Sequence, residues 1–231
     1  MILTPSVYAE AYVSAELSQL WQSRNDQRVP GNTGTQFSIA SFNKGPFTGY
    51  RIYAGYIFDK RHEIRALYAP LELEVSGQFH QPVNFQGTNF NASTDTKAFY
   101  KFNSYRLTYA YHYDEWNQWF LALGFSAKIR DAEVRLSQGG LSASKSNVGF
   151  VPLLNFQARC QLAETWQFRF DFDGLAAPQG RAIDAGFFLD YKIEKTSLFG
   201  GYRTVEGGAD NDTVYNFAWF HQAVLGLNYT F

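Results

Sequence analysis

The chain ends on QAVLGLNYTF (residues 222–231), and the side chains of this segment alternate between two chemical kinds. The even positions are mostly small or polar. The odd positions carry Ala223, Leu225, Leu227, Tyr229 and Phe231. Because successive side chains of a β-strand point to opposite faces, the segment predicts a strand with one apolar face.

The same alternation recurs along the sequence, and no segment shows a convincing helical period. The predicted strands are 6–20, 46–58, 62–79, 97–113, 119–136, 148–162, 166–176, 182–192, 196–205 and 216–231. Short turns are expected at 59–62, 114–118, 163–165 and 194–195, and long links at 21–45, 80–96, 137–147, 177–181 and 206–215. Alternate connections of an up-and-down sheet lie at the same end, so we expect tight turns at one end and long loops at the other. No linker divides the chain, which predicts a single domain over residues 1–231.

Two of the predicted strands change the phase of their apolar positions part-way. In the third segment these positions move from even numbers, such as Tyr68, to odd numbers, such as Leu73, across Pro70. A similar change occurs in the fifth segment near Asp131. Because proline lacks the N–H that a sheet requires, we interpret the first change as a β-bulge.

Composition restricts the class of protein. The 231 residues carry a formal net charge of -1, and charged residues make up 18%, against about 25% in soluble domains. A near-zero net charge argues against nucleic-acid binding. The single cysteine, Cys160, excludes an internal disulfide. No apolar run is long enough for a transmembrane helix. The first five residues lack the pattern of a secretory signal, so we expect any signal to have been removed.

Strands with one apolar face form a closed barrel in water or in lipid. Ten apolar faces would overfill the interior of a small soluble barrel, and most segments exceed the 9–11 residues that span a bilayer. The sequence therefore predicts an all-β, up-and-down antiparallel transmembrane β-barrel with ten strands. Eight or twelve strands, and a soluble sandwich or lipocalin-like barrel, are the alternatives. Aromatic residues predicted to lie at the membrane interfaces are Tyr56, Tyr111, Tyr113, Trp119, Trp166 and Tyr191 near the short turns, and Trp219 towards the long loops.

The last strand resembles the C-terminal strand of Gram-negative outer-membrane β-barrel proteins, because Leu225, Leu227, Tyr229 and Phe231 match its alternating apolar pattern. The resemblance implies that these residues form the signal read by the barrel-assembly machinery and that the last strand pairs with the first. It also implies an outer-membrane location among phospholipid and lipopolysaccharide, with periplasmic short turns and extracellular long loops. It does not indicate a particular function.

The faces opposite the apolar ones carry charges of both signs, which predicts a polar interior filled by side chains. The expected network comprises Glu10, Arg51, Arg65, Glu72, Glu74, Arg106, Lys128, Arg130, Arg159, Arg169, Asp171, Asp173, Asp184, Asp190 and Arg203. Within it, Asp173 and Asp184 are expected to face each other near the outer mouth. Glu72 and Glu74 are expected to pair with arginines.

Candidate sites for chemistry are weak. Glu206, Asp210 and Asp212 offer oxygen ligands for a cation, but a solvated acidic loop is the preferred interpretation, and no cofactor is expected. His221 lies on the predicted lipid face. Outer-membrane lipid A deacylases carry a serine two residues from such a histidine, but here Trp219 and Ala223 take those positions, so the nucleophile is missing.

We therefore expect a non-enzymatic structural or interaction protein that meets a partner through its long loops. The loops 21–45 and 80–96 carry aromatic residues that could fold over the mouth or bind that partner, although packing within the loops is the preferred interpretation: Phe37, Phe42, Phe47, Phe85 and Phe90. The alternatives are a narrow pore for small solutes or ions, and a hydrolase that uses carboxylates at the rim.

Overall fold

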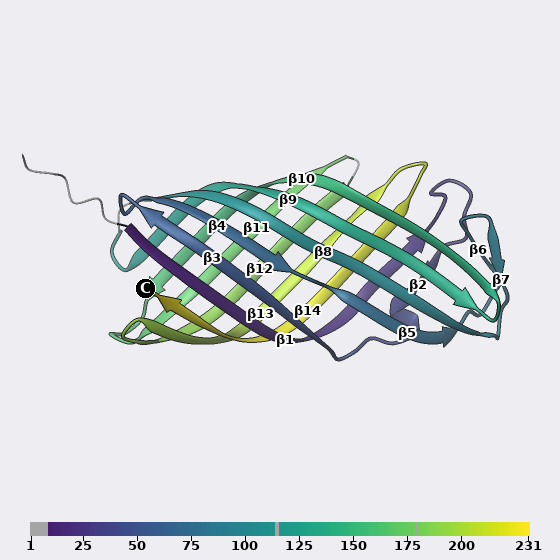
Figure 1. Cartoon of the computed structure of the whole chain (residues 1–231), viewed down its shortest axis with the longest axis horizontal. Helices are drawn as coiled ribbons and strands as arrows, with labels where there is room; N and C mark the ends of the chain where they lie inside the picture. The colour runs from purple at the N-terminus through teal and green to yellow at the C-terminus, as the bar shows by residue number, and fades with distance from the viewer. Residues whose placement is uncertain (1–8, 114–115, 179) are drawn as a thin grey trace, which may run out of the picture.

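The computed structural model describes residues 9–113, 116–178 and 180–231, which form one antiparallel β-barrel (Figure 1). Its wall consists of β1 (Ala9–Arg28), β3 (Phe47–Phe58), β4 (His62–Ala69) with β5 (Glu72–Gln78), β8 (Asp95–His112), β9 (Trp119–Gln138), β10 (Leu141–Gln161), β11 (Trp166–Ala177), β12 (Gly180–Ile193), β13 (Thr196–Asp210) and β14 (Tyr215–Thr230). The loops add β2 (Phe37–Ser38), the 3-10 turn η1 (Ile39–Ser41), β6 (Val83–Phe85) and β7 (Thr88–Phe90). No helix in these ranges is long and apolar enough to cross a membrane.

The barrel closes where β14 pairs with β1, as Tyr229 lies opposite Val13. The Phe231 N–H also donates to the Ala11 carbonyl at 2.9 Å. Because β4 and β5 both pair with β8, they count as one wall strand, and the described residues form ten. The predicted fold class and strand number are therefore confirmed. Parts of the predicted strand 6–20, of the short turn 114–118 and of the long link 177–181 lie outside the described residues.

Two of the predicted long links, 137–147 and 206–215, are largely strand, and a third, 21–45, begins as strand. β9 and β10 continue to a tight turn at Gly139 and Gly140, and β13 and β14 are joined by residues 211–214. β1 continues to Arg28. These segments lack the apolar alternation of membrane strands, but their backbone groups still pair with a neighbouring strand. The long connections at the loop end are consequently residues 29–46, which contain β2 and η1, and residues 79–94.

The predicted bulge at Pro70 is absent. Ala69 lies opposite Ser104 of β8, and Glu72 lies opposite Lys101, so the residue pairing continues across Pro70 without an inserted residue. The pairing of β9 with β8 is likewise continuous through Asp131. The odd-numbered side chains of β4 and β5 therefore face the interior on both sides of Pro70, and the change of apolar phase needs another explanation.

The explanation is that the apolar side chains change from the outer face to the inner face of an unbroken wall. Near the short turns they face outward, where Ile64 is 45% and Leu107 57% exposed. Near the loops they face inward, where Leu73 is 4% and Leu136 0% exposed. We call the half of the wall near the short turns the lower half and the half near the loops the upper half. The pattern is the one expected if lipid surrounds the lower half and water surrounds the upper half.

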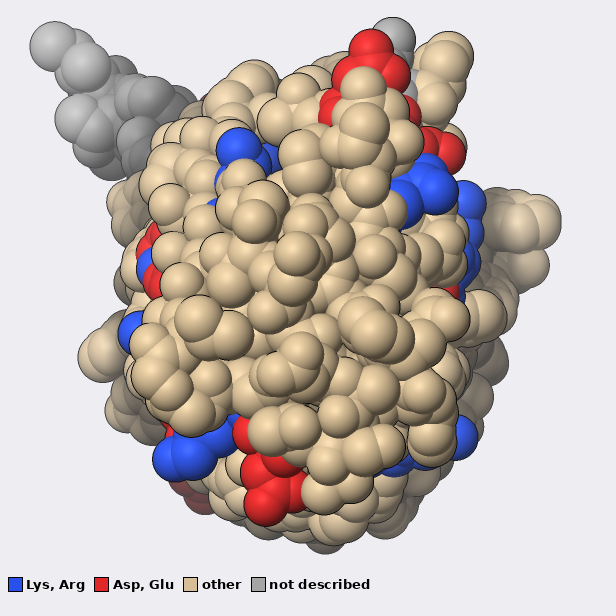
Figure 2. All heavy atoms as spheres, turned by 90° about the vertical axis from the view of Figure 1, so that its right-hand side faces the viewer, with Lys and Arg blue, Asp and Glu red and all other residues tan. Residues whose placement is uncertain are grey.

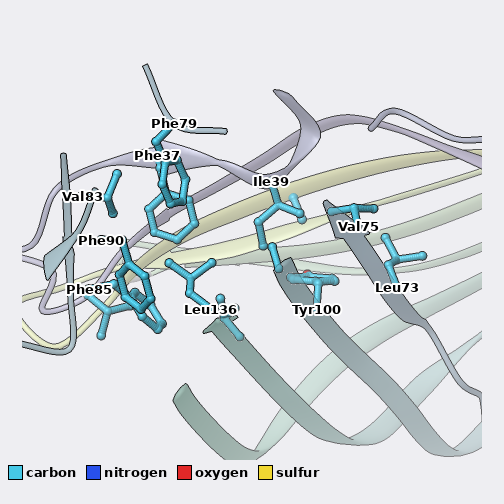
Figure 3. Packing of buried hydrophobic residues seen from close by; sticks show 14 of the residues in the cluster. Phe37, Ile39, Leu73, Val75, Phe79, Val83, Phe85, Phe90, Tyr100 and Leu136 are labelled. Carbon is cyan, nitrogen blue, oxygen red and sulfur yellow. The ribbon is translucent and has the colours of Figure 1, made fainter. Parts of the chain in front are cut away.

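The inward-facing apolar residues pack against the two long loops and fill the loop end of the barrel (Figure 3). We call this cluster the apolar plug. Phe37, Phe85 and Phe90 of the loops are buried in it, and Phe42 and Phe47 pack against it. The loop aromatics thus fold over the mouth, as one interpretation of the sequence expected. The plug consists of Leu20, Val29, Phe37, Ile39, Leu73, Val75, Phe79, Val83, Phe85, Phe90, Ala98, Tyr100, Val134, Leu136, Ala218 and Phe220.

Candidate functional site

A buried layer of charges lies across the middle of the barrel, and its centre is Asp184 of β12. Three guanidinium groups surround this carboxylate: Arg51 Nη2 at 2.5 Å, Arg106 Nη2 at 2.7 Å and Arg203 Nη1 at 2.7 Å. Arg203 also binds Glu16 Oε1 at 2.8 Å. These five groups come from five separate strands and meet because each occupies an inward position of its strand. We call this group, with Asp173, the central charge layer.

Asp173 lies directly opposite Asp184 on β11, so the two predicted carboxylates do face each other. Asp173 accepts hydrogen bonds from Arg106 Nη1 at 3.0 Å, Ser126 Oγ at 2.5 Å and Asn155 Nδ2 at 3.0 Å. The predicted position at the rim is wrong: Asp173 is 8% and Asp184 3% exposed, because the surrounding wall extends well beyond them. Carboxylates fixed by arginines are poor candidates for proton transfer or for activating water.

A second group of charges lies closer to the short turns. Arg169 forms ion pairs with Asp171 and, at 3.1 Å, with Asp190. Its guanidinium carbon lies 4.3 Å from the ring centroid of Phe188 and 4.5 Å from that of Phe199. The two rings and two carboxylates hold the guanidinium in one orientation, as expected of a structural ion pair.

A third group is centred on Glu63 of β4, which is 0% exposed and which our prediction omitted. Its carboxylate accepts a hydrogen bond from Gln157 Nε2 at 2.9 Å, lies 3.1 Å from His112 Nε2 and binds the Tyr12 hydroxyl. The sequence could have indicated that Glu63 faces the lumen, because Glu63 and Arg65 are two residues apart and therefore lie on the same face of the strand.

The remaining predicted lumen residues have different surroundings. Lys128 is 3% exposed, and its Nζ lies 4.6 Å from the centroid of the Phe102 ring. Arg65 is buried with its guanidinium carbon 5.8 Å from the Tyr53 ring centroid, and Arg130 donates to Asn147.

Glu72 and Glu74 are not part of the lumen, and the prediction for them was wrong. Both are exposed on the outer face of β5. Glu72 accepts a hydrogen bond from Asn103 Nδ2 at 2.8 Å, and Glu74 lies 4.0 Å from Lys97 Nζ. The error follows from the assumed bulge, because an inserted residue would have turned both side chains inward.

A cavity of about 790 Å³ occupies the lumen between the central charge layer and the short turns. Its lining includes Glu10, Arg159, Asp171 and Lys192. At the opposite end the apolar plug fills the barrel. Figure 2 shows this loop end as a surface of mostly uncharged side chains, with charged groups towards its margin and no opening into the interior. The cavity therefore does not continue through the barrel.

The predicted interfacial aromatics and terminal-strand residues face outward. At the short-turn end, Trp166 and Tyr191 pack with ring centroids 4.9 Å apart, and Tyr111 and Tyr113 with centroids 5.2 Å apart. The outward-facing residues Tyr56, Tyr113, Trp119, Trp166, Tyr191, Trp219, Leu225, Leu227, Tyr229 and Phe231 are 37–71% exposed. Lipid is the surrounding that suits such a belt of apolar and aromatic side chains.

The candidate cation ligands do not converge. Glu206 lies on the outer face of β13 and is bound by Arg181. Asp210 and Asp212 are exposed at the end of β13 and in the following turn. Within the described ranges, no group of three or more histidine, cysteine, aspartate or glutamate residues could hold a metal ion.

Comparison with solved structures identifies the architecture. The outer-membrane protease OmpT of Escherichia coli is 12% identical with a TM-score of 0.57, and the match covers 100% of this chain and 99% of OmpT. The chain has the fold of a Gram-negative outer-membrane β-barrel protein. Neisserial surface protein A (17% identity, TM-score 0.38) and the attachment invasion locus protein Ail of Yersinia pestis (11%, TM-score 0.43) also match the chain. These matches cover 97% and 96% of this chain and 99% of either protein.

No protein-family model matches the chain, and no curated protein matches it. At such low identities the likeness to OmpT concerns the fold alone. The function has to be inferred from the geometry of the barrel itself.

Proposed function

We propose that the chain is an integral outer-membrane protein with a closed lumen, which acts as a structural and interaction protein through its extracellular end. The observation that carries this proposal is the double closure of the interior. The central charge layer fills the lumen at the level of the membrane, and the apolar plug fills it at the extracellular end. Either closure alone would oppose passage of a hydrated solute.

The central charge layer opposes passage because its side chains bind one another. Asp184 alone accepts bonds from three arginines, so moving any one of these side chains aside would leave a buried charge without a partner. Leaving a buried ion unpaired costs about 3–5 kcal/mol. The narrow pore that the sequence left open therefore lacks support, as does the hydrolase with carboxylates at the rim.

The extracellular loops are bound to one another, which supports a fixed surface for recognition. The Thr35 N–H donates to the Asn84 carbonyl at 2.9 Å, and the Gln86 N–H donates to the Val29 carbonyl at 2.9 Å. These bonds join residues 29–46 to residues 79–94. A surface that is already ordered loses little conformational entropy when a partner binds.

Conductance in a planar bilayer tests the closed lumen. Refolding is first verified by the difference in gel mobility between unheated and boiled samples. We expect the folded chain to be silent, and a variant that lacks residues 81–92 to be silent too, because the central charge layer remains. Steady, ion-selective openings of the full chain would contradict the proposal. Openings of the shortened variant alone would place the closure in the loops.

Photo-cross-linking in native membranes tests the interaction surface. A cross-linking residue replaces exposed Gln81 at the loop end, and a matched variant carries it at exposed Lys195 in a short turn. We expect a discrete protein adduct from position 81 that position 195 does not give. Identical adducts from both positions, or none from position 81, would count against recognition by the loops.

A further inference from the structure

A serine and a histidine meet on the outside of the barrel. Ser23 Oγ of β1 lies 3.0 Å from His221 Nε2 of β14, although the two residues are 198 positions apart. The sequence predicted that no nucleophile accompanies His221, but that prediction considered only Trp219 and Ala223, its neighbours on the same strand. The adjacent strand supplies the serine because the barrel closes between β14 and β1. A serine hydroxyl within hydrogen-bond distance of a histidine is the core of a nucleophilic site.

Regular alternation from outward Trp21 places Ser23 on the outer face, and a β-bulge places Arg24 beside it on the same face. Gln22 lies opposite Phe220 and Arg24 lies opposite Trp219, so Ser23 is the inserted residue of β1. Gln22 points inward and is 1% exposed, whereas Ser23 is exposed and Arg24 half-buried on the outer side. Bulges are a recurrent means of turning a side chain towards a functional site.

Neighbouring groups hold the imidazole of His221 in place. Its Nδ1 atom contacts the hydroxyl of Tyr202 on β13, and its ring centroid lies 5.3 Å from that of Trp219. When the Tyr202 oxygen accepts the Nδ1 proton, the lone pair of Nε2 is directed at Ser23. In that tautomer His221 can take the proton of the serine hydroxyl.

The pair lies at the outer boundary of the apolar belt. Trp219 and Tyr229 both face outward and are ten positions apart on β14, which matches the 9–11 residues that cross a bilayer. Leu225 lies between them and is 71% exposed. Immediately beyond the pair come the outward charges of Arg24 and Glu206. The molecules that reach such a position on the wall are lipids of the outer leaflet.

Arginines and aromatic rings form a cluster directly above the pair. The guanidinium carbons of Arg24 and Arg181 each lie 5.0 Å from the ring centroid of Phe217, and that of Arg28 lies 4.9 Å from the centroid of Tyr215. Arginine binds phosphate in two-pronged geometry. The members, which carry one net positive charge, are Arg24, Asp26, Arg28, Arg181, Glu206, Tyr215 and Phe217.

We propose that Ser23 and His221 form a hydrolytic site for fatty-acyl esters of phosphate-bearing lipids in the outer leaflet. The arginine cluster binds the phosphate, and the acyl chains lie along the exposed apolar side chains of β14. This activity goes beyond the proposed function, since it uses the outer wall and leaves the lumen and the loops as they are. The expectation of a non-enzymatic protein would then hold for the interior and the loops only.

The reaction consumes water and releases a fatty acid. Ser23 Oγ attacks the ester carbonyl carbon while His221 Nε2 takes the hydroxyl proton. The tetrahedral intermediate expels the lipid alcohol, which receives that proton, and the acyl group remains on Ser23. Water then attacks the acyl-serine, again with His221 as the base. The fatty acid leaves as the proton returns to Ser23.

The test uses the full chain refolded in vesicles. A fluorophosphonate probe reports the activated serine, and release of fatty acid is measured from glycerophospholipid vesicles and, separately, from lipopolysaccharide. We expect labelling at Ser23, and release at least about 100-fold slower in Ser23→Ala and His221→Ala. Ser142→Ala removes an exposed serine on β10 that contacts another serine and is expected to retain full activity.

The substrates and a further variant sharpen the outcome. Hydrolysis of the glycerophospholipid identifies that source of the ester, and hydrolysis of lipopolysaccharide identifies the other. Tyr202→Phe is expected to lower kcat about tenfold with KM unchanged, because Tyr202 positions His221 and does not bind substrate. A correctly folded wild-type chain that neither takes the label nor releases fatty acid from either lipid overturns the proposal. Equal loss of labelling in Ser142→Ala and Ser23→Ala does so too.

Discussion

The lower and upper halves of the barrel are built from the same strands, but their apolar side chains lie on opposite faces of the wall. In β9, inward Lys128 is 3% exposed and outward Phe125 is 67% exposed. Further along the same strand, at the loop end, inward Leu136 is 0% exposed and the side chain of outward Arg135 is 47% exposed. Side chains alternate without interruption between these two levels of β9, and the register of β9 with β8 does not shift.

The difference shows that the solvent decides which face of a strand is apolar. In the lower half lipid contacts the outer face, so polar side chains collect inside and satisfy one another there. In the upper half water contacts the outer face, so the interior becomes an ordinary apolar core. Four substitutions test this comparison, in order of expected effect.

The largest effect is expected from Asp184→Asn. It leaves Arg51, Arg106 and Arg203 without their shared carboxylate, which should cost about 3–5 kcal/mol of unfolding free energy. Urea unfolding in lipid vesicles measures the loss. Asp212→Asn, in an exposed turn, is the control and should change little. Equal losses in the two variants would mean that the lower interior is not held by its charges.

In the upper half, Leu136→Ala should leave a cavity in the apolar plug. Truncation of a fully buried leucine costs about 2–5 kcal/mol. The matched variant is Leu225→Ala, which removes the same atoms from a side chain that is 71% exposed and should cost much less in the same unfolding measurement. A similar cost for both would deny that the upper interior is a packed core.

A charge on the outer face should be harmful in the lower half only. Leu225→Arg places a guanidinium in the lipid belt, at a cost of about 2–4 kcal/mol near the bilayer midplane. Ser144→Arg places it on the outer face near the start of β10, at the loop end of the barrel, and is expected to be nearly neutral. Folding yield in vesicles and urea unfolding compare the two. If Ser144→Arg were as harmful, the membrane would extend further up the wall than the side chains indicate.

The smallest effect is expected from Glu74→Gln. The Glu74 carboxylate is exposed and lies 4.0 Å from Lys97 Nζ, and exposed pairs contribute about 0–1 kcal/mol. We expect a change in unfolding free energy within about 0.5 kcal/mol. A loss as large as that of Asp184→Asn would return Glu74 to the lumen network in which the sequence had placed it.

The comparison also explains which sequence-based predictions failed. Apolar periodicity was assumed to mark the lipid face throughout, so the changes of phase at Pro70 and near Asp131 were interpreted as irregularities of the strand. Both instead mark the level at which the wall leaves the lipid. The prediction that residues 137–147 and 206–215 are loops failed for a related reason. Strands whose outer face contacts water need no apolar alternation on that face.

The sequence by itself determined the features that depend on local side-chain alternation: the strands, their number, the closed barrel and the lipid-facing belt that ends at Phe231. It also indicated which charges enter the lumen wherever the phase was assigned correctly. Tertiary structure alone decided which charges bind each other, because Arg51, Arg106 and Arg203 reach Asp184 from separate strands. It alone brought Ser23 to His221, because closure of the barrel makes neighbours of its first and last strands.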